Sequence, residues 1–85
     1  MATAWLVPSE TDSAPDAVDG DYLLRPAGDL YEIGSVASGC TWIGTVAASL
    51  LPELPQVDGP QQAPEQEKVL LALRGVESAE THRGG

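Results

Sequence analysis

The stretch Tyr22–Val46, with the sequence YLLRPAGDLYEIGSVASGCTWIGTV, sets the predicted architecture. Residues 26–29, Pro-Ala-Gly-Asp, form a favourable four-residue hairpin connection, because proline comes early and glycine late. That loop length pairs Arg25 with Leu30, and the alternation of side chains along the two strands then separates two faces. One predicted face carries Tyr22, Leu24, Tyr31 and Ile33, and the other carries Leu23, Arg25, Leu30 and Glu32.

The next segment, 34–46, is predicted to be extended rather than helical. It contains three glycines and five β-branched residues. Each glycine in a helix interior costs about 1 kcal/mol relative to alanine, and β-branched residues add smaller losses. A three-residue turn at Ala37–Gly39 instead reverses the chain and starts another strand.

This turn fixes the register of the third strand. It pairs Val36 with Cys40 and lays Trp42 across Gly34, so that an aromatic ring covers a bare backbone position. The same register continues to the pairs Ile33 with Ile43 and Leu30 with Val46. We therefore predict a three-stranded antiparallel β-meander over about 22–25, 30–36 and 40–46.

A C-terminal helix is predicted over about 64–81. Pro64 suits the first helical position, and Glu65 and Glu67 suit the electropositive first turn. Apolar residues recur at helical spacing, at Val69, Leu70, Leu73 and Val76. Because one such helix buries too little surface to be stable alone, we expect it to pack on one face of the sheet, which gives an α+β fold.

The chain divides into four predicted parts. Residues 1–21 hold a short strand at Trp5–Val7 and then an acidic loop. Residues 22–51 hold the meander and a short helical turn. Residues 52–63 are a proline-rich extended linker, and 64–85 hold the helix and a Gly-Gly tail.

A docking surface is predicted on the face of the sheet opposite the helix. One helix covers one face only, so the other exposes apolar residues unless the N-terminal strand or the turn near 50–51 covers it. The predicted partner-binding residues are Leu23, Leu30, Val36, Trp42 and Val46. A patch of that size marks a surface for a partner or for self-association.

The charge balance narrows the class of partner. Thirteen acidic residues against four basic ones give a net charge of −9. Such a chain repels nucleic acids and anionic lipid headgroups and attracts a basic protein surface, or the excess of acid serves solubility alone. The four basic residues do not cluster, so we expect no direct nucleic-acid binding.

A membrane span and an oxidising compartment are both disfavoured. The uncharged stretch Ile33–Pro52 is long enough to cross a bilayer, but it contains three glycines and no basic residue flanks it. The N-terminal residues lack the positive charge of a signal peptide. Cys40 is the single cysteine, so we expect a cytoplasmic protein without a disulfide and without a membrane partner.

No catalytic or metal-binding constellation is found in the sequence. Cys40 and His82 are formally a nucleophile and a base, but a small buried hydrophobe is the commoner role for such a cysteine. One Cys and one His fall short of a zinc site, and no phosphate-binding glycine loop is present. We expect no enzyme activity and no cofactor.

The last two residues, Gly84 and Gly85, give a second hypothesis. A terminal Gly-Gly resembles the tail of ubiquitin-like modifiers and sulfur-carrier proteins. The resemblance implies an extended tail whose carboxylate an activating enzyme adenylates. It departs from those families in one respect, since their tails leave a strand of a β-grasp fold and this tail follows a predicted helix.

These observations favour a small acidic protein-binding module without catalytic activity. It would act as an inhibitor or an adaptor on a basic protein partner, for example by mimicking phosphate charge. The alternatives are a carrier or modifier that works through the Gly-Gly tail, and a structural subunit of a larger assembly.

Overall fold

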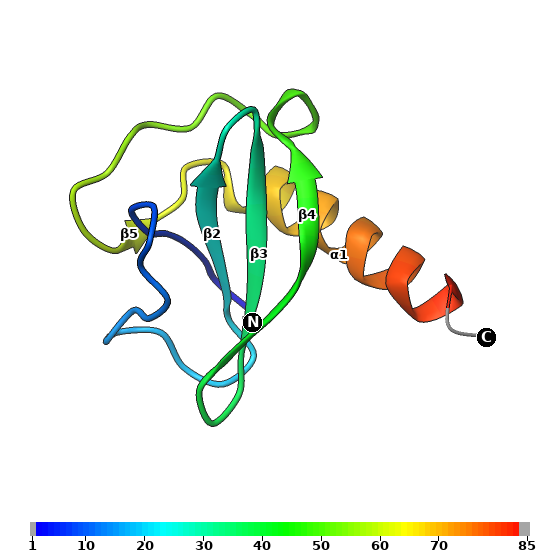
Figure 1. The fold of residues 1–85 in the computed structure, drawn as a ribbon, viewed down its shortest axis with the longest axis horizontal. Helices are drawn as coiled ribbons and strands as arrows, with labels where there is room; N and C mark the ends of the chain where they lie inside the picture. The colour runs from blue at the N-terminus through cyan, green and yellow to red at the C-terminus, as the bar shows by residue number, and fades with distance from the viewer. Residues whose placement is uncertain (1, 84–85) are drawn as a thin grey trace.

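The structure, a computed structural model, describes residues 2–83, with side chains described through residue 78. It is an α+β fold in which a five-stranded mixed sheet packs against one helix (Figure 1). The elements are β1 (Ala4–Leu6), β2 (Tyr22–Ala27), β3 (Leu30–Val36), β4 (Cys40–Ala47), the 3-10 turn η1 (Ala48–Leu50), β5 (Gln61–Gln62) and α1 (Gln66–Arg83). The strand order is β4-β3-β2-β1-β5, so the predicted meander is present as β2 to β4, but two further strands extend the sheet.

The hairpin β2–β3 is paired two residues away from the predicted register. Arg25 pairs with Glu32, because the turn consists only of Gly28 and Asp29. Gly28 has a φ of +67°, a conformation that glycine adopts without a Cβ penalty. Because side chains alternate with a period of two, a shift of two residues leaves every residue on its predicted face.

The first half of the β3–β4 register is confirmed. Val36 pairs with Cys40 and Gly34 with Trp42. A Cβ atom on Gly34 would lie 2.6 Å from Sγ of Cys40 and 3.1 Å from a ring carbon of Trp42. The close approach of these two side chains therefore requires glycine at this position.

The second half of that register is wrong, because a β-bulge interrupts β4. The register shifts between Ile33 and Gly34, so Ile33 pairs with Gly44 and Tyr31 with Val46. An extra residue in one strand reverses the faces of all residues after it. Val46 consequently lies on the helix side of the sheet, only 3% exposed, and not on the predicted docking face.

Strand β1 pairs in parallel with β2, which the sequence did not predict. Trp5 lies beside Leu23, and the backbone N–H of Val7 donates to the carbonyl of Leu24 at 3.0 Å. Two adjacent parallel strands need a crossover connection, and residues 8–21 provide it. Ala14 and Ala17 of this crossover pack against a small cluster formed by Trp5, Val7 and Leu23, so this face of the sheet is partly covered.

Helix α1 covers the other face. Val69 and Leu73 are fully buried in one apolar cluster with side chains of all four longer strands. The helix begins at Gln66 and not at Pro64, because Glu65 has a φ of +51°. It continues through Gly75, as expected, and its last turns extend beyond β4 (Figure 1).

The side chain of Gln66 joins the start of α1 to β1. Its Oε1 accepts from the N–H of Ala4 at 2.8 Å, and its Nε2 donates to the carbonyls of Ala4 and Ala63 at 2.8 and 2.7 Å. This amide therefore pairs with β1 as a neighbouring peptide group would. In the part of the chain that the structure describes, no helix has the length and apolar character needed to cross a bilayer.

Candidate functional site

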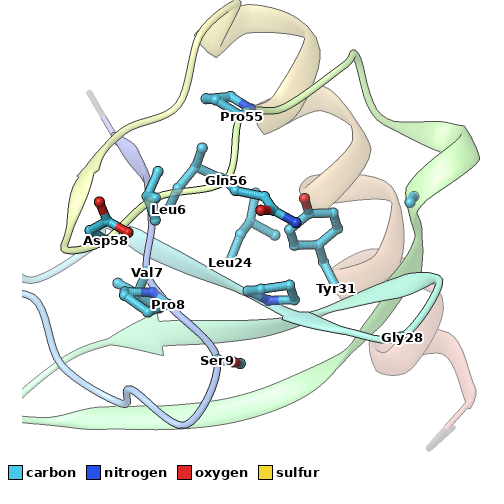
Figure 2. A pocket seen from close by; sticks show the side chains of 13 residues that line it. Leu6, Val7, Pro8, Ser9, Leu24, Gly28, Tyr31, Pro55, Gln56 and Asp58 are labelled. Atoms are coloured by element: carbon cyan, nitrogen blue, oxygen red, sulfur yellow. The ribbon is translucent and has the colours of Figure 1, made fainter.

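The first candidate site is a hollow of about 410 Å³ between the sheet and the proline-rich segment 52–60, called here the linker hollow (Figure 2). In Figure 1 this segment arches away from the sheet between η1 and β5. The lining residues come from β1 to β3, from the chain after β1, from the β2–β3 turn, from η1 and from the linker. They are Leu6, Val7, Pro8, Ser9, Leu24, Pro26, Gly28, Tyr31, Ala48, Pro55, Gln56, Val57 and Asp58.

Apolar side chains that the fold already buries lie beneath the linker hollow. Leu6 and Leu24 are buried side chains of neighbouring strands, and their other sides belong to the helix-face cluster. Three prolines, at positions 8, 26 and 55, line the walls. Proline has a fixed φ and no backbone donor, so these walls offer flat apolar contact with little loss of conformational entropy on binding.

The rim of the linker hollow is polar. Ser9, Tyr31, Gln56 and Asp58 contribute it. Within residues 2–83, no hydrogen bond or ion pair engages these four side chains. In Figure 2 the side chain of Gln56 extends toward Tyr31, and Asp58 lies on the side of Val7 and Pro8. The rim thus presents two hydroxyls, an amide and a carboxylate to a ligand.

A second hollow, of about 540 Å³, lies on the opposite face of the sheet and is called here the loop hollow. It is lined by the crossover residues Asp12, Ser13, Ala14, Ala17 and Asp19 and by Leu23, Val36, Gly39, Cys40 and Trp42 of the sheet. The guanidinium of Arg25 lies 3.9 Å from the ring centroid of Trp42, and its Nε donates to Glu32 at 3.1 Å. Its Nη1 donates to the carbonyl of Thr11 at 3.2 Å, which ties the crossover to the sheet.

Cys40 in the loop hollow is a poor nucleophile. Its thiol is half-buried, and burial raises its pKa above the ordinary value of 9.0. The nearby carboxylate of Asp12 raises the pKa further, and Arg25 lowers it by a smaller amount. Since the thiolate is the reactive form, this environment suppresses the reactivity of the thiol.

Asp21 has a structural role. Its side chain is only 3% exposed and accepts hydrogen bonds of 3.0 Å from the N–H groups of Thr3 and Val18 and from Nε1 of Trp5. Burial raises its pKa, but the three donors outweigh burial and hold the pKa below its usual value of 3.8. This carboxylate therefore holds the N-terminal strand and the end of the crossover together.

The structure brings together three of the five predicted partner-binding residues. Leu23, Val36 and Trp42 all line the loop hollow, where Leu23 is completely buried. Val46 lies on the other face because of the bulge, and Leu30 is half-buried beside the β2–β3 turn. The predicted open docking face is thus partly occupied by the chain's own crossover, and partner binding by these residues stays a prediction.

Two other interpretations of the sequence concern the C-terminal Gly-Gly tail and metal binding. Gly84 and Gly85 lie outside the described residues, so the tail hypothesis stays a prediction. Within residues 2–83 there is no group of three or more histidine, cysteine or carboxylate side chains that could hold a metal ion.

Sequence reasoning missed the linker hollow. The segment 52–63 was interpreted as a linker because of its prolines, and an extended linker was not expected to form a wall. A signal was present, because Leu54 and Val57 are apolar residues within the proline-rich segment, and both pack on the helix-face cluster. Comparison with known proteins finds no family model that matches the chain, and neither a curated protein nor a solved structure that is similar to it.

Proposed function

We propose that the protein is a non-catalytic binding module that holds an extended, basic segment of a partner protein in the linker hollow. The observation that carries this proposal is the combination of proline walls with four polar side chains that have no partner within residues 2–83. Small concave sites that combine apolar walls with a few convergent polar groups are typical ligand sites.

The extended conformation of the segment follows from the walls. Tyr31 and the prolines at 8, 26 and 55 line one hollow. Proline-rich ligands in the polyproline II conformation dock in grooves lined by aromatic side chains, because the ligand is already ordered before it binds, and Tyr31 supplies such a side chain here. An extended chain also exposes its own carbonyls and N–H groups to Gln56 and Ser9.

The basic character of the segment follows from the charge distribution. Two of the four basic residues, Arg25 and Lys68, are paired with Glu32 and Glu65. Asp58 on the rim is exposed and has no such partner. A basic side chain of the ligand would pair with it, and the net charge of −9 would accelerate encounter with a basic partner.

An inhibitor or an adaptor would act by binding a basic segment of its partner in the linker hollow. A basic segment bound in the linker hollow is no longer free to bind the partner's own ligands. This mode of action requires no chemical reaction at the linker hollow. Binding driven in part by charge must weaken as salt is added, whereas apolar contact with the prolines persists.

The test uses an eight-residue peptide of alternating lysine and proline, with its glutamate counterpart as the charge control. In ¹H–¹⁵N spectra of the full chain, the lysine peptide should shift the amides of Ser9, Tyr31 and residues 56–58. Asp58→Asn should weaken binding about two- to fivefold. Asp16→Asn removes an exposed acid that lines neither hollow, and it should leave the affinity nearly unchanged.

Two results would overturn the proposal. In the first, the lysine peptide shifts no amide around the linker hollow. In the second, the two charge variants weaken binding equally, which would show attraction to the net charge and no defined site.

A further inference from the structure

The two edges of the sheet are unlike each other. On one side the sheet ends at β5, which is two residues long. Pro60 comes directly before this strand, and Pro64 follows it after one intervening residue. On the other side it ends at β4, which is eight residues long and contains neither a charged residue nor a proline. Within residues 2–83, β4 pairs with β3 alone, so its outer backbone edge has no neighbouring strand.

An edge of this kind is a template for another strand. Outward N–H and C=O groups of an edge strand pair readily with an added chain, and proteins commonly block them with lysine, proline or a short strand. The bulge in β4, opposite Ile33 and Gly34 of β3, is the single such device in this strand, and Thr41 and Thr45 are exposed on either side of it. The edge at β5, by contrast, is short and bounded by prolines.

Helix α1 supplies a second observation. It packs on the sheet and then continues past β4, so its last turns extend beyond the last strand (Figure 1). Its 18 residues correspond to about 27 Å of helix. A strand added beside β4 would lie against this overhang, and every second side chain of the added strand would face α1.

The opposite face of the same edge carries more acid than base, because Arg25 over Trp42 is already paired with Glu32. Asp12 and Asp19 of the crossover line the loop hollow together with Cys40 and Trp42 of β4. Side chains of an added strand that point away from α1 would therefore lie on the side of these two carboxylates. That arrangement favours basic residues at those positions, and the net charge of −9 opposes pairing with a second copy of the chain.

We propose that the free edge of β4 takes one extended strand of a basic partner protein as a sixth strand of the sheet. One set of alternate side chains of that strand faces α1, and the other set, which is basic, lies on the side of Asp12 and Asp19. This surface lies on β4 and does not involve the linker hollow. Main-chain pairing supplies affinity here, and the alternation of side chains supplies selectivity.

The test uses the full chain and an eight-residue peptide of alternating lysine and valine. Saturating peptide should slow the exchange of alternate backbone amides in residues 40–47 by about tenfold and leave residues 61–62 unchanged. The same peptide with N-methyl groups on every second residue keeps its charge but cannot pair along one edge, so it should lose this protection. Asp12→Asn should weaken binding, and Asp16→Asn serves as the matched control.

Three results would overturn the inference. The peptide could protect no amide of β4, or the N-methylated peptide could bind equally well. The β4 amides could also be protected without peptide while sedimentation shows a concentration-dependent dimer, which would make a second copy the occupant. Protection at β4 by the lysine–valine peptide, with no shift at the linker hollow by the lysine–proline peptide, would sustain this inference and remove the proposed function, and the reverse pair of results would do the opposite.

Discussion

The two faces of the sheet are covered in different ways. On the helix face, aliphatic side chains from the sheet and from α1 form one cluster whose central members, Leu24, Ile33 and Leu73, are completely buried. On the loop face, the cluster of Trp5, Val7 and Leu23 is smaller, and the crossover adds only the alanines 14 and 17 to it. Polar groups supply further contacts of the crossover, among them the side chains of Asp19, Asp21 and Arg25 and backbone hydrogen bonds to Val36.

This difference shows which forces hold each layer. Burial of apolar area stabilises the helix face, and its free energy depends little on pH or salt. The crossover makes too few apolar contacts to be held by burial of apolar area alone. The buried carboxylate of Asp21 and the side chain of Arg25 supply polar contacts in their place. We therefore expect the helix face to govern global stability and the loop face to govern its dependence on pH and salt.

The largest effect is expected for Leu73→Ala on the helix face. Loss of this fully buried side chain should lower the free energy of unfolding by about 2–5 kcal/mol, because a cavity remains in the cluster. For a domain of this size that loss approaches the total stability. Urea unfolding followed by circular dichroism measures it. Leu71→Ala, in the same helix but 71% exposed, is the control and should change stability by no more than about 0.5 kcal/mol.

The second expected effect is that of Asp21→Asn on the loop face. An amide in place of the carboxylate turns one acceptor into a donor that faces N–H groups, so the variant should lose about 1–3 kcal/mol at neutral pH. The helix face should remain packed, so far-ultraviolet circular dichroism should change little. Equal losses from Asp21→Asn and Leu73→Ala would contradict the contrast between the two faces.

The pH dependence of stability provides a sharper measurement on the same residue. The folded-state pKa of Asp21 is lowered, so its contribution is present above the unfolded pKa near 3.8 and is lost as pH falls through the folded value. Wild-type protein should therefore lose more stability than Asp21→Asn when the pH is lowered from 6 through that range. Parallel pH profiles for the two proteins would show that the carboxylate is not what anchors the crossover.

A smaller effect is expected for Arg25→Gln. The substitution removes the ion pair with Glu32, the contact with the ring of Trp42 and the hydrogen bond to Thr11, and it should cost about 0.5–1.5 kcal/mol. Lys68→Gln removes the more exposed pair with Glu65 and should cost less. If the cost of Arg25→Gln were the same in low and high salt, the ion pair would contribute little and the ring contact would dominate.

The sequence was sufficient where side-chain alternation alone determines the structure. The faces of Leu23 and Leu24 follow from a period of two, and an error of two residues in register does not change them. The pairing of Trp42 with Gly34 was also predictable, since a short turn fixes it. Val46 was not, because a bulge follows from local strain and packing that no residue type announces.

Long-range contacts explain the remaining failures. The three residues of β1 pair in parallel with β2, which follows a crossover of some fifteen residues. Nothing in the sequence of either strand specifies that these two strands pair. The crossover that covers the loop face and the linker hollow both depend on this pairing of β1 with β2. Without β1 beside β2, neither Leu6 nor Val7 would reach the hollow. The candidate site could therefore not be predicted from local patterns.

The smallest expected effect is on the alkylation rate of Cys40, which reports on the loop face without a change in the fold. Its pKa is raised, so alkylation by iodoacetamide at pH 8 should be several-fold slower in the folded protein than in urea. Asp12→Asn removes a charge that raises this pKa and should speed the reaction, because more of the thiol is then ionised. Asp16→Asn should not change the rate. If Asp12→Asn and wild-type protein reacted equally fast, burial under the crossover alone would protect the thiol, and the acidic wall of the loop hollow would have no electrostatic influence on it.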